Sequence, residues 1–283
     1  MGSQMPELEK LFDEWAEKHS KLLSQKAPYF IDHEPPFGRF VRDGVVNLDE
    51  WKKQKLRICF ILPEASGFDN LEKHPADQIC DVAAEWNEKG AFTPIVQMIA
   101  CWTKAVYDST TAPVPFAKKS LLKQKNDLIR SIAVVNIKKS DGQFKPDLKK
   151  LKNFAATDAE EIRKEIEIIK ANIIVCCGNF NLLYGKRPEG ETEDSKRTCV
   201  FYEDELVKGG ARAYKWGKNK LVLSLWSVAQ RYKPGSSRVV NYYAVREIAR
   251  TGIKSFQSTT KSTTKKNAEP KKKAEPKKKK VEK

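Results

Sequence analysis

The stretch that decides the fold class is residues 58–70, ICFILPEASGFDN. Its first five residues are apolar without alternation, which is typical of a parallel strand covered on both faces. Pro63 has no N–H to donate, so strand pairing should end there. The small residues Ala65 and Gly67 leave room for a ligand near the backbone. The stretch therefore predicts a buried strand that carries Glu64 to a sheet edge, where open α/β sheets bind ligands. A plain turn with a solvated glutamate is the alternative.

Three further apolar runs have the same strand-like character and lie far apart along the chain. Together with the first run they predict four strands, at residues 56–62, 132–137, 173–177 and 221–225. Helical patterns occur at residues 6–24, 92–107, 159–171 and 238–251. Strands that alternate with helices favour a parallel sheet with helices on both faces. The predicted fold is α/β, with three α/β/α layers around a central, mainly parallel four-stranded sheet.

Composition divides the chain into three parts. A helix and a Pro-rich segment occupy residues 1–45, the α/β domain residues 46–254, and a Lys-rich tail residues 255–283. The tail has eleven Lys and three Glu, which is half of the net charge of +16. It has almost no apolar side chain to bury, so we expect it to be disordered. Such a tail would attract nucleic-acid phosphates by counterion release. A solubilising tail or a nuclear-import signal is the alternative.

Several classes of protein are disfavoured by what the sequence lacks. The six cysteines form no C-x-x-C pair, so we expect small core residues in a reducing compartment, with no metal site and no cofactor. No apolar run approaches the roughly 20 residues of a membrane span, and no secretory signal is evident. Phosphate-loop, dinucleotide and zinc-deaminase motifs are missing. We therefore expect an intracellular monomer, in the nucleus or in the nucleoid and cytoplasm.

Polar or aromatic residues follow three of the four predicted strands, where such a sheet places its functional groups. An amide buried at a strand end can read the edge of a nucleobase because it both donates and accepts hydrogen bonds. Neighbouring lysines are then placed to meet phosphates. Each residue also has a structural interpretation, as a loop cap, a solvated face or core. The candidates are Glu64, Ser66, Gly67 and Asp69 after the first strand, Asn136, Lys138 and Lys139 in the second, and Trp226, Ser227 and Arg231 after the fourth.

The order of these motifs, across roughly residues 40–252, resembles the uracil-DNA glycosylase superfamily. LPEASG is similar to the G-E-A-P-G motif of its thermostable branch, with Glu64 at the carboxylate position and Gly67 at the final glycine. GAFTPIVQMI resembles a helix start that places Phe92 where that branch stacks an aromatic ring on the extruded base. VVNIKKSDGQFKP is similar to T-N-V-V-K-C-R-P-P-G-N-R-x-P, with Asn136 at the base-reading position. IIVCCGNFN resembles the third strand and its glycine turn.

The chain departs from the family pattern at several positions. SLWSVAQRY occupies the place of the H-P-S loop that enters the minor groove, and Trp226 stands where the family has a histidine that stabilises the departing base. The prolines of the first and last motifs are missing. The cysteines that bind the iron–sulfur cluster of the thermostable branch are also absent, so the resemblance implies a member without this centre.

The resemblance implies a DNA glycosylase that flips a damaged or modified base out of the helix. Phe92 would stack on the base and Asn136 would read it. Glu64, with Asp69 in reserve, would stabilise the positive charge on the sugar and orient water. Backbone N–H groups, Ser227 or the Trp226 indole would donate to the leaving base, or the ring would act as a wedge in the helix. A non-catalytic nucleic-acid-binding module on the same fold is the alternative.

Overall fold

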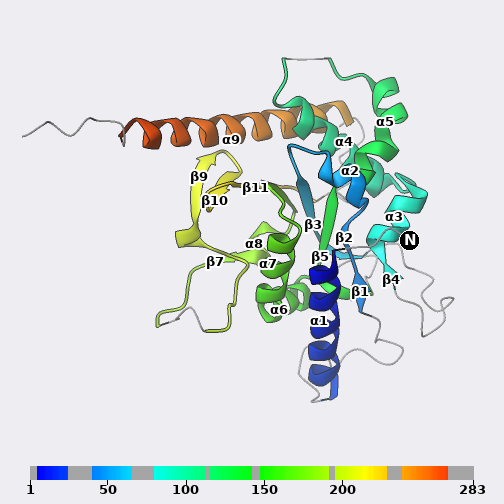
Figure 1. Cartoon of the computed structure of the whole chain (residues 1–283), viewed down its shortest axis with the longest axis vertical. Helices are drawn as coiled ribbons and strands as arrows, with labels where there is room; N and C mark the ends of the chain where they lie inside the picture. The colour runs from blue at the N-terminus through cyan, green and yellow to red at the C-terminus, as the bar shows by residue number, and fades with distance from the viewer. Residues whose placement is uncertain are drawn as a thin grey trace, which may run out of the picture.

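The computed structural model describes residues 5–24, 40–65, 80–112, 115–141, 147–190, 195–227 and 238–266. Within them seven strands form one mixed sheet. Helices cover both faces of this sheet (Figure 1). The order of the strands across the sheet is β2-β5-β3-β6-β11-β10-β9. Their bounds are β2 Gly44–Val45, β3 Ile58–Ala65, β5 Ala133–Asp141, β6 Ile173–Cys177, β9 Leu206–Gly210, β10 Ala213–Trp216 and β11 Lys220–Leu225.

The helices connect and cover these strands. They are α1 Pro6–Ser24, α2 Leu48–Lys52, α3 Val82–Lys89, α4 Pro94–Asp108, α5 Lys118–Arg130, α6 Leu148–Thr157, α7 Ala159–Ile168, α8 Phe180–Leu183 and α9 Arg238–Lys266. Two short parallel pairs complete the described structure: β1 Val41–Arg42 with β4 Cys80–Asp81, and β7 Tyr184–Gly185 with β8 Phe201–Tyr202.

The four predicted strands form the parallel centre of the sheet, in the order β5-β3-β6-β11. The mainly parallel α/β fold is therefore confirmed, but the prediction of four strands is wrong. β2 pairs antiparallel with β5, while β10 and β9 add an antiparallel extension beyond β11. β2 has two residues, which is too short for a sequence pattern. β9 is LVKGG and lies half exposed, so it lacks the apolar run that marks a covered strand.

The unbroken apolar run at the start of β3 is explained by two cores, one on each face. Ile58, Phe60 and Leu62 face the core formed with α3, α4, α5 and α9. Cys59 and Ile61 face the core formed with α1, α6, α7 and α8. Alternate side chains of a strand point to opposite faces of the sheet. Because both faces of β3 are buried here, apolar residues occupy successive positions instead of alternating with polar ones.

The chain leaves neighbouring strands toward opposite faces of the sheet. After β3 it continues to α3, α4 and α5, which pack on one face, whereas after β6 it enters α8, which packs on the other. This makes the gap between the carboxyl ends of β3 and β6 the topological switch point, the place where open α/β sheets bind ligands.

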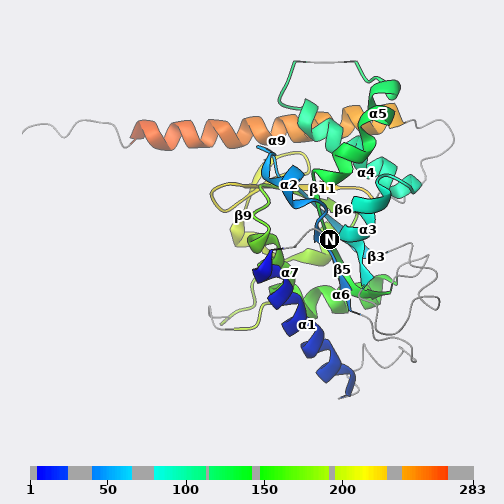
Figure 2. The same ribbon diagram turned by 45° about the vertical axis from the view of Figure 1, so that its right-hand side comes forward.

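The two end helices differ from expectation in opposite ways. α1 has the predicted bounds, and Leu8, Phe12 and Trp15 bury its apolar face in the second core, so this helix is part of the domain core. α9 begins as predicted but continues to Lys266, past the expected start of the tail at Ser255, and it projects beyond the sheet in Figures 1 and 2. Most of the Pro-rich segment, at residues 25–39, and residues 267–283 lie outside the described residues.

Candidate functional site

Glu64 and Lys138 face each other at the carboxyl edge of the parallel sheet. They are register partners on β3 and β5, and Lys138 Nζ lies 3.5 Å from Glu64 Oε2. The two side chains are only 4% and 7% exposed. Removing a carboxylate from water is costly, and a cation in contact with it offsets part of that cost. The sheet therefore holds the predicted catalytic carboxylate in a protected ion pair.

Asn136 lies on the same side of the sheet as this pair. It is two residues before Lys138, and its register partner on β3 is Leu62, two residues before Glu64. From strand geometry, the Cα atoms of Asn136 and Glu64 are about 8 Å apart. The Asn136 side chain is fully buried, and its Oδ1 has no hydrogen-bond partner among the described residues. Because buried polar atoms are nearly always paired, this unpaired acceptor makes Asn136 a candidate ligand contact.

The other end of the Asn136 amide is held by Asp43, which the sequence did not single out. Asp43 Oδ2 accepts from the Asn136 backbone N–H at 2.6 Å and from Nδ2 at 2.9 Å. Asp43 is fully buried and lies between β1 and β2, directly before β2 pairs with the edge of β5. Two donors from one residue converge on a single carboxylate oxygen, so the position of the amide is well determined.

Lys139 belongs to a buried charge cluster beneath this amide. Its ammonium donates to Asp43 and, at 2.7 Å, to Glu165 Oε2 of α7, and it lies 4.9 Å from the ring centroid of Trp15. Burial, followed by the nearby Asp43 charge, raises the pKa of Glu165 well above its ordinary value. Burial alone would lower the pKa of Lys139, but the two carboxylates outweigh it and raise this pKa. In the sequence, Glu165 falls on the apolar face of its predicted helix. A charged residue at such a position indicates a buried charge, and this pattern could have pointed to the cluster.

The two lysines do not meet the expectation that they contact phosphates. Lys138 is 6% exposed and Lys139 is fully buried, each drawn inward by carboxylates of the protein. Because lysines are usually exposed, the sequence favoured a solvent-exposed position for both side chains, whereas the structure buries them. In this structure their charges act inside the protein.

A second polar residue lies at the switch point itself. Asn179, in the turn after β6, donates from Nδ2 to the carbonyl of Ile61 in β3 at 2.9 Å, and its buried Oδ1 has no partner among the described residues. Gly178 before it has φ 79°, and a Cβ there would lie 2.8 Å from the backbone nitrogen of Ser227. Glycine thus lets the chain after β11 approach the turn after β6, which brings the predicted residue Ser227 to the same edge.

Trp226 is anchored by packing rather than free to enter DNA. Its Nε1 donates to Oδ1 of Asn241 in α9 at 2.9 Å, and its ring packs edge-on against Trp102, with centroids 5.6 Å apart. The indole N–H is therefore already engaged within the protein. These contacts favour the core interpretation of Trp226 over a wedge or a donor to a leaving base.

Phe92 is not brought to Glu64 or Asn136 by any described contact. Its ring is 42% exposed in the turn between α3 and α4, with Lys89 Nζ 5.5 Å from the ring centroid. The neighbouring Ala91 N–H donates to Asn126 Oδ1 of α5, so this turn packs on α5. Four further predicted site residues, Ser66, Gly67, Asp69 and Arg231, lie outside the described residues.

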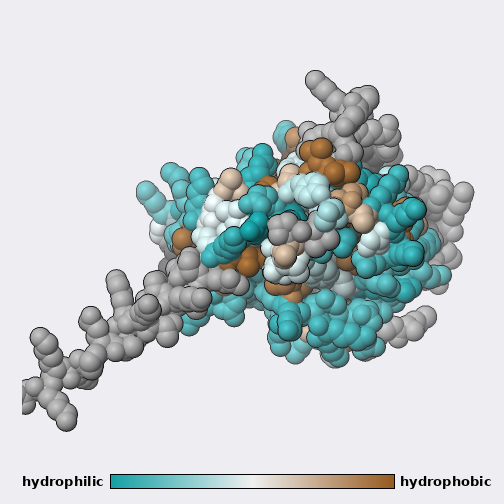
Figure 3. All heavy atoms as spheres, turned by 90° about the horizontal axis from the view of Figure 1, so that it is seen from above, coloured by the Kyte–Doolittle hydropathy of each residue, from teal (hydrophilic) through white to brown (hydrophobic). Residues whose placement is uncertain are grey.

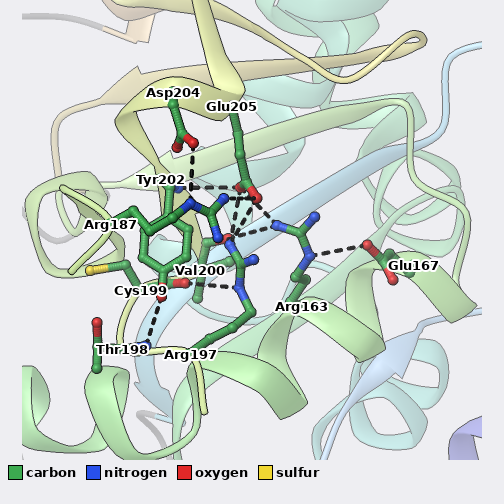
Figure 4. A network of polar contacts seen from close by, with 10 residues as sticks. All are labelled: Arg163, Glu167, Arg187, Arg197, Thr198, Cys199, Val200, Tyr202, Asp204 and Glu205. Carbon is green, nitrogen blue, oxygen red and sulfur yellow. Dashed lines mark hydrogen bonds and ion pairs between the residues drawn. The ribbon is translucent and has the colours of Figure 1, made fainter. Parts of the chain in front are cut away.

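A separate polar network fastens the long connection between β6 and β11 to α7 (Figure 4). Arg163, Arg187 and Arg197 all donate to Glu205, at 2.8, 3.4 and 3.0 Å for their shortest contacts. The Tyr202 ring lies under Arg187 and Arg197, whose guanidinium carbons are 4.4 and 4.2 Å from its centroid. The guanidinium groups are already bound to groups of the protein, so the network is structural.

Among the described residues, no group of three or more His, Cys, Asp or Glu could hold a metal ion, and no helix is long and apolar enough to cross a membrane. Viewed from the side of α9, the surface is mostly hydrophilic with small apolar areas (Figure 3).

No family model matches the chain, and no curated protein and no solved structure matches it significantly.

Proposed function

We propose that this protein is a DNA glycosylase that hydrolyses the N-glycosidic bond of a damaged or modified base. The observation that carries the proposal is the placement of Glu64 and Asn136. Both are buried on one face of adjacent parallel strands, beside the switch point, and Asn136 keeps an unused acceptor there. A carboxylate and a base-reading amide at this separation suit a pocket for one flipped nucleotide.

The chemistry requires compensation of two charges. Positive charge develops on the sugar as the bond breaks, and Glu64 would stabilise it and orient the attacking water. The leaving base becomes negative. Lys138, 3.5 Å from Glu64, is a buried cation at the same edge and would offset that charge in place of the missing histidine. Asn136 Oδ1 would accept a hydrogen bond from the base.

The charge of the chain supports a polyanionic partner. A net charge of +16 favours association with nucleic-acid phosphates through release of bound counterions. With Lys138 and Lys139 buried, the phosphate contacts must come from other cations. The Lys-rich C-terminal segment is the strongest source of such charge in the sequence.

A second function on the same fold is a non-catalytic nucleic-acid-binding module. The observation that favours it is Trp226, which stands at the position of the family's histidine and whose N–H is bound to Asn241. In this alternative Glu64 and Lys138 stabilise each other and do no chemistry.

An excision assay separates the two functions. Single- and double-stranded oligonucleotides, each with one modified base, are incubated with the protein and then treated with alkali, which cuts the strand at abasic sites. We expect alkali-dependent cleavage at one class of modified base. Binding of these oligonucleotides without cleavage at any base would contradict the glycosylase proposal and support the binding module.

A further inference from the structure

We propose that Asp43 is a positioning residue that determines which end of the Asn136 amide faces the ligand. This inference rests on the proposed function, in which Asn136 reads a base. An amide can bind with its oxygen or its nitrogen toward a ligand, and the two orientations select opposite hydrogen-bonding patterns. A fixed neighbour that accepts from the nitrogen removes one of them.

The geometry meets this requirement. Asp43 Oδ2 accepts from both N–H groups of Asn136, at 2.6 Å from the backbone nitrogen and 2.9 Å from Nδ2. A reversed amide would place Oδ1 against the Asp43 carboxylate, oxygen against oxygen, with no proton between them. The observed orientation leaves Oδ1 buried and without a partner among the described residues. The side of the amide that faces away from Asp43 is therefore an acceptor.

Lys139 supports Asp43 in this role from the other side of its carboxylate. The Lys139 ammonium donates to the second oxygen of Asp43 and also to Glu165 Oε2. The groups that contact Asp43 are therefore donors: the ammonium at Oδ1, and the backbone N–H and Nδ2 of Asn136 at Oδ2. Asp43 accepts from all three, and the ammonium offsets its charge within the fully buried cluster.

A fixed acceptor at Asn136 would select between bases whose hydrogen-bond donors and acceptors are exchanged along one edge. A base that presents a ring N–H to Oδ1 is favoured over one that presents a bare ring nitrogen. Uracil and cytosine form such a pair, as do hypoxanthine and adenine, because donor and acceptor are exchanged at the same ring positions. In the Asp43→Asn variant the new amide can donate to Asn136 Oδ1, so the reversed orientation becomes possible.

The test compares binding, so it does not depend on excision. Anisotropy titrations measure the affinity of single-stranded oligonucleotides that differ only in one base of each pair. We expect wild type to favour the N–H member of at least one pair by about tenfold or more. Asp43→Asn should reduce that ratio to within about twofold or reverse it. The control is Asp158→Asn, an equally buried aspartate that binds Lys18 and His19 elsewhere, which should keep the ratio.

A second variant keeps the test decisive if Asp43→Asn does not fold. In Asn136→Asp, the new carboxyl group lies against Asp43 and should hold a proton, donating it to Asp43 while its carbonyl faces the ligand. The preference for the N–H base should then persist while overall affinity falls. An unchanged ratio in folded Asp43→Asn, a reversed ratio in Asn136→Asp, or no preference in wild type would overturn the role of Asp43. A preference that behaves as expected without excision would instead contradict only the catalytic proposal.

Discussion

Glu64 and Lys138 are partners across two neighbouring parallel strands, with Lys138 Nζ 3.5 Å from Glu64 Oε2 and both side chains buried. The carboxylate proposed for the chemical step is thus held beside a cation, away from bulk water. Electrostatic interactions are stronger in such a site than at the surface. The same ion pair therefore contributes to the stability of the sheet edge and holds the carboxylate that we propose for the chemical step.

Lys138→Met should destabilise the protein strongly at neutral pH. The substitution leaves the buried Glu64 carboxylate without this cation, which costs about 3 to 5 kcal/mol when a buried pair is broken. Urea unfolding at neutral pH measures this loss, with the exposed Lys149→Met as control. A loss no larger than that of the control would contradict the role of Lys138 as the counter-charge of Glu64.

Trp226→Phe should lower the free energy of unfolding by about 1 to 3 kcal/mol. The ring is largely kept, but Asn241, which is 2% exposed, loses the donor to its Oδ1. The double variant Trp226→Phe/Asn241→Leu should recover part of the loss, because both polar partners are then absent. A Trp226→Ala variant of wild-type stability that fails only on duplex substrates would restore the wedge interpretation.

Glu165→Gln should make the protein less sensitive to rising pH. The pKa of Glu165 is raised above its ordinary value of 4.5, first by burial and then by Asp43. Its contribution to stability is therefore complete below the unfolded pKa and is lost as pH rises through the folded pKa. Glutamine does not titrate, so the Tm of the variant relative to wild type should rise between pH 5 and pH 8. The control is Glu167→Gln, whose side chain is 47% exposed on the same helix. Parallel Tm curves for wild type and Glu165→Gln would contradict the raised pKa.

Removal of residues 267–283 should weaken DNA binding at low salt and flatten its dependence on salt. This cut follows the last residue of α9, Lys266, and spares Ser255, which packs near Gly209 of β9. The removed segment carries eight Lys and three Glu, and each lost phosphate contact should reduce the salt slope by about 0.9. A tail of equal length with glutamine in place of its lysines should behave like the truncation. A lower Tm, or the same slope, would argue against a purely electrostatic tail.

The parallel centre of the fold was predictable because strands covered on both faces consist of unbroken apolar residues. β3, β5, β6 and β11 all carry this signal, and Glu64 lies just after the first apolar run. The prediction that pairing ends at Pro63 is wrong, because β3 continues to Ala65 and pairs with β5 at Glu64 and Ala65. β9 and β10 were missed because Lys and Gly interrupt them at the half-exposed edge of the sheet. A central strand can be predicted from its own apolar residues. An edge strand has few of them, and its pairing depends on the neighbouring strand.

The polar interior of the site was less predictable. Asp43 and Lys139 are 96 positions apart, and only the folded sheet brings them together. Sequence reasoning placed Lys139 toward phosphates because a lysine is normally exposed, and no local pattern indicates that two carboxylates will enclose it. Asn136 was identified because the apolar run appeared to end the strand at residue 137, but β5 continues to Asp141 and Asn136 lies within it. The orientation of its amide required the contact with Asp43.

The most direct test of the central claim compares the single-turnover rates of base excision by wild type and Glu64→Gln. The substrate is the modified-base oligonucleotide that wild type cleaves in the excision assay. Glutamine keeps the size of the side chain but removes the charge needed at the sugar. We predict that excision falls by at least about a hundredfold, while DNA affinity stays within a few-fold and the exposed Glu189→Gln control retains wild-type activity. Excision by Glu64→Gln at the wild-type rate, or no excision of any base by wild type, would contradict the assignment of Glu64 as the catalytic carboxylate.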